Sequence, residues 1–376
     1  MKKLGVGIIG CGNISAAYLR LAPTFKALEV RKVADVNMDA AKARAEEFGV
    51  QAVSVDDLMS ATDIDVIVNL TIPNAHFEVS KRILESGKHV YSEKPFVLSL
   101  EEGEELRALA AAKGLRVGSA PDTFMGGAHQ DARAAIDAGG LGKITSGSAH
   151  VMSHGPEGWH PNPDFFYDLG GGPMLDLGPY YLTNLIQLLG PIEKVAALTS
   201  APLATRPIGS GPREGETVPV KTPTNIHALL QFKNGATITL STSWDVWAHR
   251  HKNMELYGTE GSIFIPDPNF FGGDVLTGGT DGEMTVLEKS DHPFGVPNQD
   301  HKQGMMANYR TAGLADMAQA IAENRPHRCS LEMALHAIDA MVSILKSGET
   351  GEFVTLSTTC ERPAALGPDE ARELMV

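Results

Sequence analysis

The chain has 376 residues, of which 21% are charged and 43% hydrophobic, and its formal net charge is −14. This length fits two domains with separate cores, at the usual size of roughly 100–200 residues each. An acidic chain without a cluster of basic residues lacks the contacts that nucleic-acid phosphates need, so we expect no nucleic-acid partner. The three cysteines, Cys11, Cys329 and Cys360, form neither a disulfide framework nor a metal pattern. Their scatter favours a reducing, cytoplasmic location.

The amino-terminal residues superficially mimic an export signal, because a basic start precedes an apolar run that ends near Cys11. Gly5 and Gly7 interrupt this run, which is too short for the apolar core of a signal peptide. No apolar stretch of the sequence is long enough to span a membrane. We therefore interpret the run as a first buried strand and expect no membrane partner.

Residues 1–122 alternate between strand and helix patterns. We expect strands at 4–9, 30–36, 65–70, 88–91 and 115–118, and helices at 13–27, 38–48, 75–85 and 100–113. Continuous apolar runs are typical of strands buried on both faces of a parallel sheet. Repeated strand–helix units with short connections predict an α/β domain with a doubly wound parallel sheet, the Rossmann fold.

A different pattern follows residue 122. Helices are expected at 124–138 and 174–189, on either side of a strand at 143–151 and a loop at 154–172 rich in Pro, Asn and Gly. Expected strands at 195–199, 226–232, 236–243, 252–257 and 262–265 indicate a large, mostly antiparallel open sheet, with Asn234-Gly235 as a hairpin turn. Residues 201–224 have the composition of a long loop. Helices at 307–323 and 331–346 complete an α+β domain, so the predicted division is 1–122 and 123–376.

A glycine-rich turn joins the first strand to the first helix: Gly10, Cys11, Gly12, Asn13, Ile14 and Ser15. The first glycine allows a tight turn, the second lets the backbone approach a pyrophosphate, and a small third residue lets the helix lie close to the strand. The phosphate would then bind at the helix amino end. A lone glycine pattern also fits an ordinary turn, but here an acid ends the second strand.

That acid is Asp35, which is placed to accept hydrogen bonds from both hydroxyls of an adenosine ribose and would repel a 2′-phosphate. No Arg or Lys occupies positions 36–38, so the sequence favours NAD over NADP. Asp35 could instead cap the next helix, although Asn37 could fill that role.

Two further segments are expected at the cofactor. The loop after the third strand carries Thr71, Ile72, Pro73, Asn74 and His76 and would border the nicotinamide half, although Thr71 or Asn74 could simply cap the next helix. Glu93 and Lys94 follow the strand at 88–91. A lysine at the carboxyl end of a parallel strand, beside a dinucleotide, can donate a hydrogen bond to a hydroxyl that is being oxidised. The arrangement predicts hydride transfer between a nicotinamide and an alcohol.

The helix at 174–189 has a polar stripe. Asp176 and Tyr180 are four residues apart and share one face, which Thr183, Asn184 and Gln187 continue. A polar stripe on an otherwise apolar helix must meet a cleft or buried partners. A structural hydrogen-bond network is the alternative interpretation.

Four motifs resemble those of the glucose–fructose oxidoreductase/inositol dehydrogenase/rhizopine-catabolism (Gfo/Idh/MocA) family: GCGNIS at 10–15, TIPNAH at 71–76, SEKPF at 92–96 and GGGPMLDLGPYYL at 170–182. The resemblance covers nearly the whole chain and implies an NAD(P)-dependent dehydrogenase of sugars, inositols or related ring alcohols. It makes Lys94 catalytic, with a peptide before Pro95 that is often cis. It places Tyr180 where the family commonly has His, as in the glucose–fructose oxidoreductase branch. It also implies a homodimer or homotetramer that pairs through exposed sheets.

From this resemblance we expect Lys94 to stabilise the developing alkoxide, Tyr180 to take the hydroxyl proton and Asp176 to orient the substrate. A tyrosine is a poor base at neutral pH, but a nearby ammonium favours the phenolate. His160 is the rival base. Trp159 beside it would give a sugar ring an aromatic face, although a simple loop anchor is the alternative. Asp122 stands where many family members have Arg, and we expect it at the substrate.

Two other functions compete with a sugar dehydrogenase. One is a dinucleotide-binding sensor or regulator without catalysis, against which the retained Lys94 argues. The other is the same enzyme class acting on a non-carbohydrate diol or an imine, and analogy of fold does not decide this. The loop at 159–166 resembles those of bacterial members of sugar and disaccharide catabolism, including those that form 3-keto sugars. The sequence lacks the spacing of known metal sites, so we predict no catalytic metal.

Overall fold

The computed structural model describes residues 3–301 and 304–376. It contains two compact units: unit 1 comprises Met1–Gly127, Ser290–Leu335 and Pro363–Val376, and unit 2 comprises Ala128–Lys289 and His336–Arg362. The expected division after residue 122 does not anticipate that two later segments return to unit 1.

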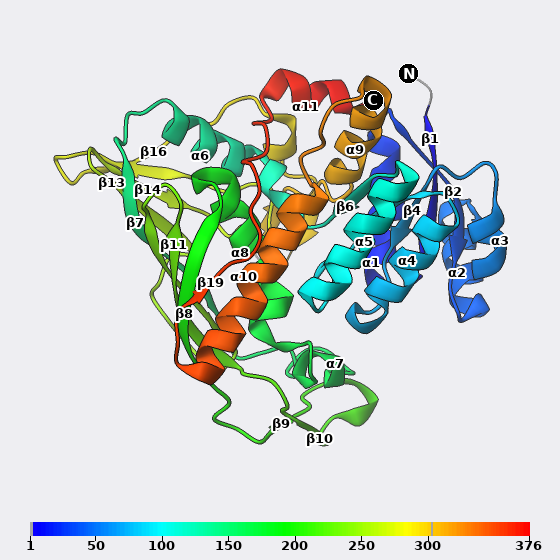
Figure 1. Cartoon of the computed structure of the whole chain (residues 1–376), viewed down its shortest axis with the longest axis horizontal. Helices are drawn as coiled ribbons and strands as arrows, with labels where there is room; N and C mark the ends of the chain where they lie inside the picture. Colours follow the sequence, from blue (N-terminus) through cyan, green and yellow to red (C-terminus); the bar gives the residue numbers. More distant parts are fainter. Residues whose placement is uncertain (1–2, 302–303) are drawn as a thin grey trace. The chain divides into compact units, whose positions relative to one another are not determined.

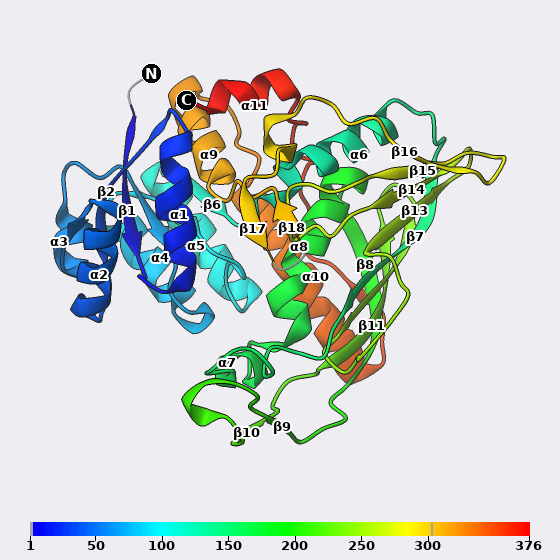
Figure 2. The same ribbon diagram turned by 180° about the vertical axis from the view of Figure 1, so that it is seen from behind.

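Unit 1 is built on a six-stranded parallel sheet with the order β3-β2-β1-β4-β5-β6. Its strands are β1 (Leu4–Ile9), β2 (Leu28–Ala34), β3 (Gln51–Ala52), β4 (Val66–Asn69), β5 (His89–Ser92) and β6 (Val117–Ser119). The intervening helices are α1 (Asn13–Leu21), α2 (Met38–Phe48), α3 (Val55–Ser60), α4 (His76–Glu85) and α5 (Leu100–Lys113). Figures 1 and 2 show α4 and α5 over one face of the sheet and α1 over the other. The predicted doubly wound α/β fold is confirmed.

Boundaries in unit 1 differ from expectation where special residues intervene. The first helix ends at Leu21 and continues as a 3-10 turn, η1 (Ala22–Thr24), at Pro23, since proline lacks the N–H that a helix interior needs. Further 3-10 turns are η2 (Pro73–Ala75), η3 (Thr123–Met125) and η5 (Pro293–Gly295). The short elements β3 and α3 have too few residues for a periodic pattern and were not anticipated.

The returning segments add a hairpin, β17 (Gln299–His301) and β18 (Gly304–Met306), and the helices α9 (Ala312–Glu323) and α11 (Pro368–Leu374) to unit 1. They also add the start of α10 (Leu331–Thr350). Helix α9 begins later than the predicted residue 307 because a side chain from another segment fixes its amino end. The Asp122 carboxylate accepts hydrogen bonds from the backbone N–H groups of Thr311 (3.0 Å) and Gly313 (2.9 Å).

Unit 2 contains a nine-stranded sheet with the order β16-β15-β14-β13-β7-β12-β11-β8-β19. The strands are β7 (Ile144–Met152), β8 (Ile192–Ser200), β11 (Asn225–Phe232), β12 (Thr237–Ser243), β13 (Met254–Gly258), β14 (Ser262–Ile265), β15 (Leu276–Gly278), β16 (Met284–Val286) and β19 (Val354–Thr355). Neighbours are antiparallel except β7 and β12, which are parallel. The predicted hairpin between β11 and β12 is confirmed, with Gly235 in the left-handed region at φ +93°.

Most of α6 (Gly127–Asp137), α7 (Asp164–Tyr167) and α8 (Gly172–Leu189) belong to unit 2. Helix α8 packs on β7, β11 and β12, and Figure 1 shows it beside this sheet. Leu198 on β8 and Leu229 on β11 are 76% and 48% exposed, so part of the sheet surface is apolar and uncovered. The expected long loop at 201–224 contains a small hairpin, β9 (Thr205–Pro207) and β10 (Thr217–Pro219), with the 3-10 turn η4 (Gly211–Arg213) between its strands. In the described residues, no helix has both the length and the apolar character to cross a membrane.

Candidate functional site

The glycine-rich turn after β1 has two glycines that are required for different reasons. Gly10 has φ +98°, and a Cβ at this position would lie 2.5 Å from the carbonyl oxygen of Leu70. The fold itself therefore demands glycine at residue 10. Gly12 has an ordinary φ of −73°, and nothing lies within 4 Å of the place where its Cβ would be. The fold leaves this space open at the amino end of α1, where a pyrophosphate would approach the backbone, so the turn fits a dinucleotide.

The Asp35 carboxylate supports the same turn. Its Oδ2 accepts a hydrogen bond from the backbone N–H of Cys11 at 2.7 Å, and its Oδ1 accepts one from Asn37 N–H at 2.8 Å. Asn37 caps α2 by accepting from the N–H of Asp39, so the alternative role of Asp35 as the cap is wrong. A carboxylate has about four acceptor positions. Asp35 is half-buried, and it keeps acceptor capacity for ribose hydroxyls.

Three other residues complete the surroundings of the turn. Asn13 is exposed and Ile14 is half-buried at its open end. Arg44 on α2 donates hydrogen bonds to the Gly12 carbonyl oxygen (3.3 Å) and to Ser15 Oγ (3.2 Å). No sequence signal marks this cation, because a helical pattern does not say which polar residue faces the turn. Burial raises the pKa of the Cys11 thiol to about 11, so this cysteine stays protonated and unreactive.

The loop after β4 is held in place by the buried side chains of Asn69 and His76. Asn69 donates to the His76 carbonyl oxygen (3.0 Å) and accepts from Thr71 Oγ1 (2.7 Å). The His76 ring nitrogens lie 2.6 Å from the Pro95 carbonyl oxygen and 3.0 Å from that of Thr71. Burial lowers the pKa of His76, so the ring is neutral at pH 7. The structure gives His76 a supporting role, and its direct contact with a cofactor stays a prediction.

The exposed residues of this loop do not cap the helix that follows them. The 3-10 turn η2 starts at Pro73 with Ile72 as its cap residue, α4 has Ala75 in that position, and neither end has a side-chain cap. The capping role of Thr71 or Asn74 is therefore wrong. Ile72 is 60% exposed. Asn74 is exposed too, and its side chain makes no hydrogen bond to any part of the chain that the structure describes.

The segment after β5 places Lys94 at the carboxyl edge of the parallel sheet. Glu93 is buried there, and its two carboxylate oxygens accept hydrogen bonds from Tyr18 Oη (2.9 Å) and from the backbone N–H of Lys94 (3.0 Å). Burial raises the pKa of Tyr18, so its phenol remains a donor to Glu93. The Lys94–Pro95 peptide is cis, as the resemblance implied. Lys94 is half-buried and follows the strand two places from β1 in the sheet order.

Asp122 has a structural role that the sequence did not reveal. It is buried, and its Oδ2 accepts both backbone N–H groups at the start of α9. Burial raises the pKa of this carboxyl to about 6. Contact of Asp122 with substrate stays a prediction.

The polar stripe of α8 divides into two parts. Asn184 Nδ2 lies 3.2 Å from His129 Nδ1, and Gln187 donates to Asn184 Oδ1 (3.0 Å). Asn184 and Gln187 therefore belong to a buried structural network, which was the alternative interpretation of the stripe. Asp176 is half-buried and Tyr180 is buried in the first turns of the helix.

The neighbouring Tyr181 is fixed by partners of its own. Its Oη donates to Asp267 Oδ1 at 3.3 Å and accepts from Asn253 Nδ2 at 3.0 Å. Tyr181 therefore has a structural role and offers a matched comparison for Tyr180.

The loop before α8 presents an aromatic surface. Trp159 is 62% exposed, and its ring is nearly perpendicular to that of His160, with centroids 5.6 Å apart. His160 also contacts Phe165 and Phe166 edge to face. The backbone N–H of Asn162 donates to His160 Nδ1 at 3.2 Å. The neutral ring therefore carries its proton on Nε2.

Arg206 anchors this loop to the β9–β10 hairpin. Its guanidinium is buried and donates to Glu157 Oε1 (2.9 Å), to Asp245 Oδ1 (2.7 Å) and to the carbonyl oxygens of His154 and Trp244 (both 2.6 Å). The hydroxyl of Tyr167 also donates to Glu157. Sequence reasoning missed Arg206, because nothing in a stretch of loop composition signals a buried cation.

Each unit thus gathers part of the predicted site. Unit 1 brings the glycine turn, Asp35, the 71–76 loop and Lys94 to the carboxyl edge of one sheet. Unit 2 carries Asp176 and Tyr180 on α8, with Trp159 and His160 in the loop before it. Among the described residues, no group of three His, Cys, Asp or Glu side chains is arranged to hold a metal ion.

Comparison with known proteins agrees with these features. Residues 4–120 match the family described as "Oxidoreductase family, NAD-binding Rossmann fold", and residues 129–264 match the "GFO/IDH/MocA C-terminal domain". The chain belongs to the Gfo/Idh/MocA family of oxidoreductases. Its first unit is accordingly an NAD-binding Rossmann domain.

Several relatives of this Gfo/Idh/MocA chain have named activities. Levoglucosan dehydrogenase of Pseudarthrobacter phenanthrenivorans is 28% identical over 331 residues, which cover 78% of this chain and 83% of that protein. The 1,5-anhydro-D-fructose reductase of Ensifer adhaerens is 24% identical over 359 residues, covering 94% and 98%. A solved structure of levoglucosan dehydrogenase with NADH has a TM-score of 0.79 at 21% identity, covering 95% of this chain and 100% of that one. This structural comparison, at 21% identity, supports the fold alone.

Replacing the buried cation tests the anchor of the loop. Arg206→Met keeps an unbranched apolar stem but removes the guanidinium, and this leaves Glu157 and Asp245 without their counter-charge. We expect the free energy of unfolding, measured with urea, to fall by about 3–5 kcal/mol, the usual cost of removing one partner of a buried ion pair. Arg213→Met is the control, because Arg213 in the same hairpin pairs with Asp164 and Glu216 at the surface and should cost much less. Equal losses in the two variants would contradict the anchoring role.

Proposed function

We propose that this oxidoreductase transfers a hydride between NAD and a secondary hydroxyl or ketone of a sugar or cyclic polyol. The observation that carries the proposal is the position of Lys94. It follows β5 at the same carboxyl edge as the glycine turn that follows β1, with only β4 between the two strands. A reacting group held at that edge would lie beside a nicotinamide bound across it.

The proposed reaction removes a proton from the hydroxyl oxygen and a hydride from its carbon. When bound, NAD supplies the hydride acceptor, C4 of the nicotinamide. The Lys94 ammonium donates a hydrogen bond to the hydroxyl oxygen and stabilises the negative charge that develops there. Tyr180 takes the proton and Asp176 orients the substrate. Glu93 acts on Lys94 through the backbone, because it fixes the Lys94 N–H.

The hydrogen bond that His160 Nδ1 accepts supports Tyr180 as the base. With Nδ1 accepting the Asn162 N–H, the neutral imidazole has its remaining nitrogen already protonated. Such a ring donates a hydrogen bond and cannot take a proton at Nε2. We therefore propose that His160 binds a substrate oxygen and that Tyr180 is the base.

The substrate class follows from the loop and from the relatives. The exposed indole of Trp159 offers an apolar face against which the C–H face of a pyranose can stack, with the donor of His160 beside it. The relatives named for levoglucosan and 1,5-anhydro-D-fructose act on cyclic sugars by name. We propose a cyclic sugar or disaccharide oxidised at a ring carbon to a keto sugar, with C3 as the candidate position.

The cofactor is proposed to be NAD and not NADP. The half-buried Asp35 is fixed by two backbone N–H groups, and Val36 directly after it is 97% exposed and uncharged. A ribose 2′-phosphate would place its charge beside this carboxylate without a cation from residues 36–38 to offset it. The nearby cation Arg44 lies at the glycine turn, where it donates a hydrogen bond to the Gly12 carbonyl oxygen.

We also propose a homodimer or homotetramer that forms through the uncovered face of the nine-stranded sheet. Exposed Leu198 and Leu229 support this, since apolar side chains in water favour association. Light scattering at micromolar concentration tests this proposal, and a monomer would contradict it. A cytoplasmic location remains a proposal from cysteine usage, and cell fractionation tests it.

Lys94→Ala tests the central assignment. We expect turnover, followed by absorbance at ~340 nm with a panel of monosaccharides, disaccharides, inositols and anhydrosugars, to fall by about 10²–10⁴-fold or more. NADH binding, measured by fluorescence titration, should stay within about threefold of the wild type. Lys113→Ala at the exposed end of α5 is the matched control and should leave both unchanged. Near-normal turnover in Lys94→Ala would remove Lys94 from the mechanism.

Tyr180→Phe and His160→Asn separate the two candidate bases. Loss of the phenol should lower kcat by about 10²–10⁴-fold, whereas His160→Asn should act mainly on KM. Tyr181→Phe, which removes the neighbouring hydroxyl, is the control and should change kcat little. A small effect in Tyr180→Phe together with a collapse of kcat in His160→Asn would assign the base to His160.

Asp35→Ser tests the cofactor preference. Without the carboxylate, we expect the ratio of kcat/KM for NAD over NADP to fall by about tenfold or more, because charged hydrogen bonds to the ribose are lost and repulsion of a 2′-phosphate is relieved. Asn37→Ala removes only the cap of α2 and should leave the ratio unchanged. An unchanged ratio in Asp35→Ser would restrict Asp35 to holding the turn.

A further inference from the structure

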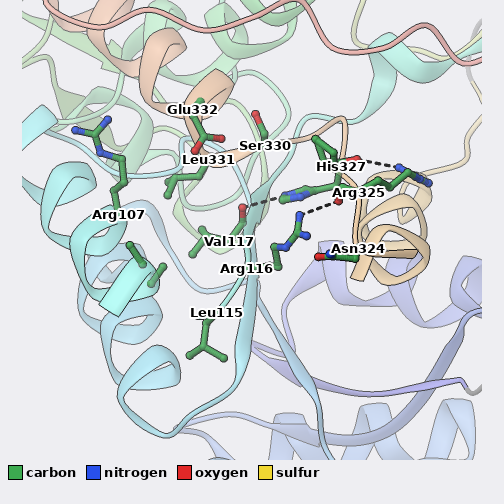
Figure 3. Close-up of a pocket in the computed structure, with 13 residues that line it drawn as sticks. Arg107, Leu115, Arg116, Val117, Asn324, Arg325, His327, Ser330, Leu331 and Glu332 are labelled. Carbon is green, nitrogen blue, oxygen red and sulfur yellow. Dashed lines mark hydrogen bonds between the residues drawn. The ribbon is translucent and has the colours of Figure 1, made fainter. Parts of the chain in front are cut away.

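A hollow in unit 1 lies away from the carboxyl edge of the sheet. It has a volume of about 480 Å³, within the range of roughly 300–1,000 Å³ that small-molecule sites occupy. Leu115 and Arg116, just before β6, line it, with α5 on one side and the segment between α9 and α10 on the other (Figure 3). It therefore opens at the amino edge of the sheet, whereas the glycine turn and Lys94 lie at the carboxyl edge.

The charge of this pocket is opposite to that of the chain. Arg107, Arg116 and Arg325 line it, in a protein whose formal net charge is −14. Within the described part of the chain, Glu332 is the only acidic side chain among the lining residues, and it is exposed. Helix α10 begins at Leu331 in the wall, so its positive amino end adds to the field.

The three arginine side chains differ in how many hydrogen bonds and ion pairs they already make. Arg325 is satisfied by Glu323, Asp316 and the Pro326 carbonyl oxygen, and Arg107 pairs with Glu104 at the surface. Arg116 makes one side-chain hydrogen bond in the described residues, from Nη1 to the Arg325 carbonyl oxygen at 2.9 Å. No described carboxylate pairs with it. Its remaining N–H donors can bind an anion, and a guanidinium presents them as a planar fork that matches carboxylate or phosphate.

Arg116 is positioned by its backbone. Its N–H donates to His89 Nδ1 at 2.9 Å, and its carbonyl oxygen accepts from Val90 N–H at 3.0 Å. His327 closes the pocket by contacting the Val117 carbonyl oxygen with Nε2 at 3.0 Å. Burial lowers the pKa of both histidines, and the nearby Arg116 lowers them further, so the cationic groups here are the arginines. The backbone of Arg116 is thus fixed, and the bond from Nη1 to the Arg325 carbonyl oxygen holds its guanidinium before a ligand arrives, which lowers the entropic cost of binding.

Part of the wall is apolar. Leu115, Val117 and Leu331 face the same hollow, together with alanines of α5. A pocket with one cationic corner and an apolar wall selects a small molecule with one anionic group and a non-polar body.

We propose that this pocket binds a small organic anion, a phosphate monoester or a carboxylate, whose charged group is held by Arg116 with Arg107 at the rim. The apolar body of the ligand lies against Leu115, Val117 and Leu331. The site is independent of the proposed catalytic residues, so its occupancy does not require that the proposed reaction be correct.

Calorimetric titration with matched probes tests the site. Phenyl phosphate, benzoate and uncharged benzyl alcohol share one ring and differ in the anionic group. The full-length protein is titrated in saturating NADH, so that the glycine turn is occupied and does not bind the phosphate probe. We expect phenyl phosphate or benzoate to bind with millimolar or lower Kd and benzyl alcohol to bind at least about tenfold more weakly. The tighter anion identifies the ligand class.

Arg116→Gln should weaken the anionic probe by about ten- to one-hundredfold, the range expected for a lost charge-assisted hydrogen bond. Arg82→Gln on α4 removes the same charge at a surface pair with Asp56, outside the pocket, and should bind the probe normally. Arg107→Gln, at a side chain that is 51% exposed, should fold normally and weaken binding by about two- to fivefold. It keeps the test decisive if Arg116→Gln does not fold.

Three results would overturn the proposal. They are the absence of binding by both anionic probes at ~10 mM, equal binding of benzyl alcohol, and equal weakening in Arg82→Gln and Arg116→Gln. The last result would mean that only the overall charge of the protein matters.

Discussion

A buried carboxylate, that of Glu93, fixes the carboxyl edge of the parallel sheet. It accepts from the hydroxyl of Tyr18 on α1 and from the backbone N–H of Lys94, so one side chain joins the first helix to the residue proposed to meet the substrate. Asn69 does the same one strand away by tying Thr71 to His76. Buried polar groups of this kind must find partners, and their hydrogen bonds here fix the backbone of the two loops that follow β4 and β5.

Much of unit 1 could be predicted because its signals are local. A continuous apolar run such as 66–69 marks a doubly covered strand, and the turn after β1 needs glycine at residue 10 for steric reasons. Tyr18 and Arg44 were missed for the opposite reason. Each acts through a hydrogen bond to a segment distant in the chain, and no periodicity or motif records such a pairing. Asn69 was missed because it lies in an otherwise apolar strand, where nothing in the sequence shows which neighbours a buried amide will bind. The shift in the start of α9 has the same origin, since its cap comes from Asp122.

Unit 2 shows where composition misleads. Residues 201–224 have the composition of an exposed loop, yet they place Arg206 beneath the aromatic loop that carries Trp159 and His160. The hairpin strands β9 and β10 are too short for an alternating pattern to reveal. On α8, by contrast, the four-residue spacing predicted a shared polar face. Only the contacts of Asn184 and Gln187 with His129 separate its structural part from the part left for chemistry.

The return of the chain to unit 1 bears on how the protein is made. The backbone N–H groups of Lys26 and Val376 donate to Leu374 and Thr24, so the last turn of α11 is joined to the segment that leads into β2. The parallel sheet is complete once Ser119 has left the ribosome, but β6 packs against α9 only after residues 312–323 have emerged, and α11 contacts α9 later still. Unit 2, whose segments end at Arg362, can close first. The cofactor-binding half would therefore begin folding first and finish last, and during that interval the nascent chain would expose apolar surface that a chaperone could bind.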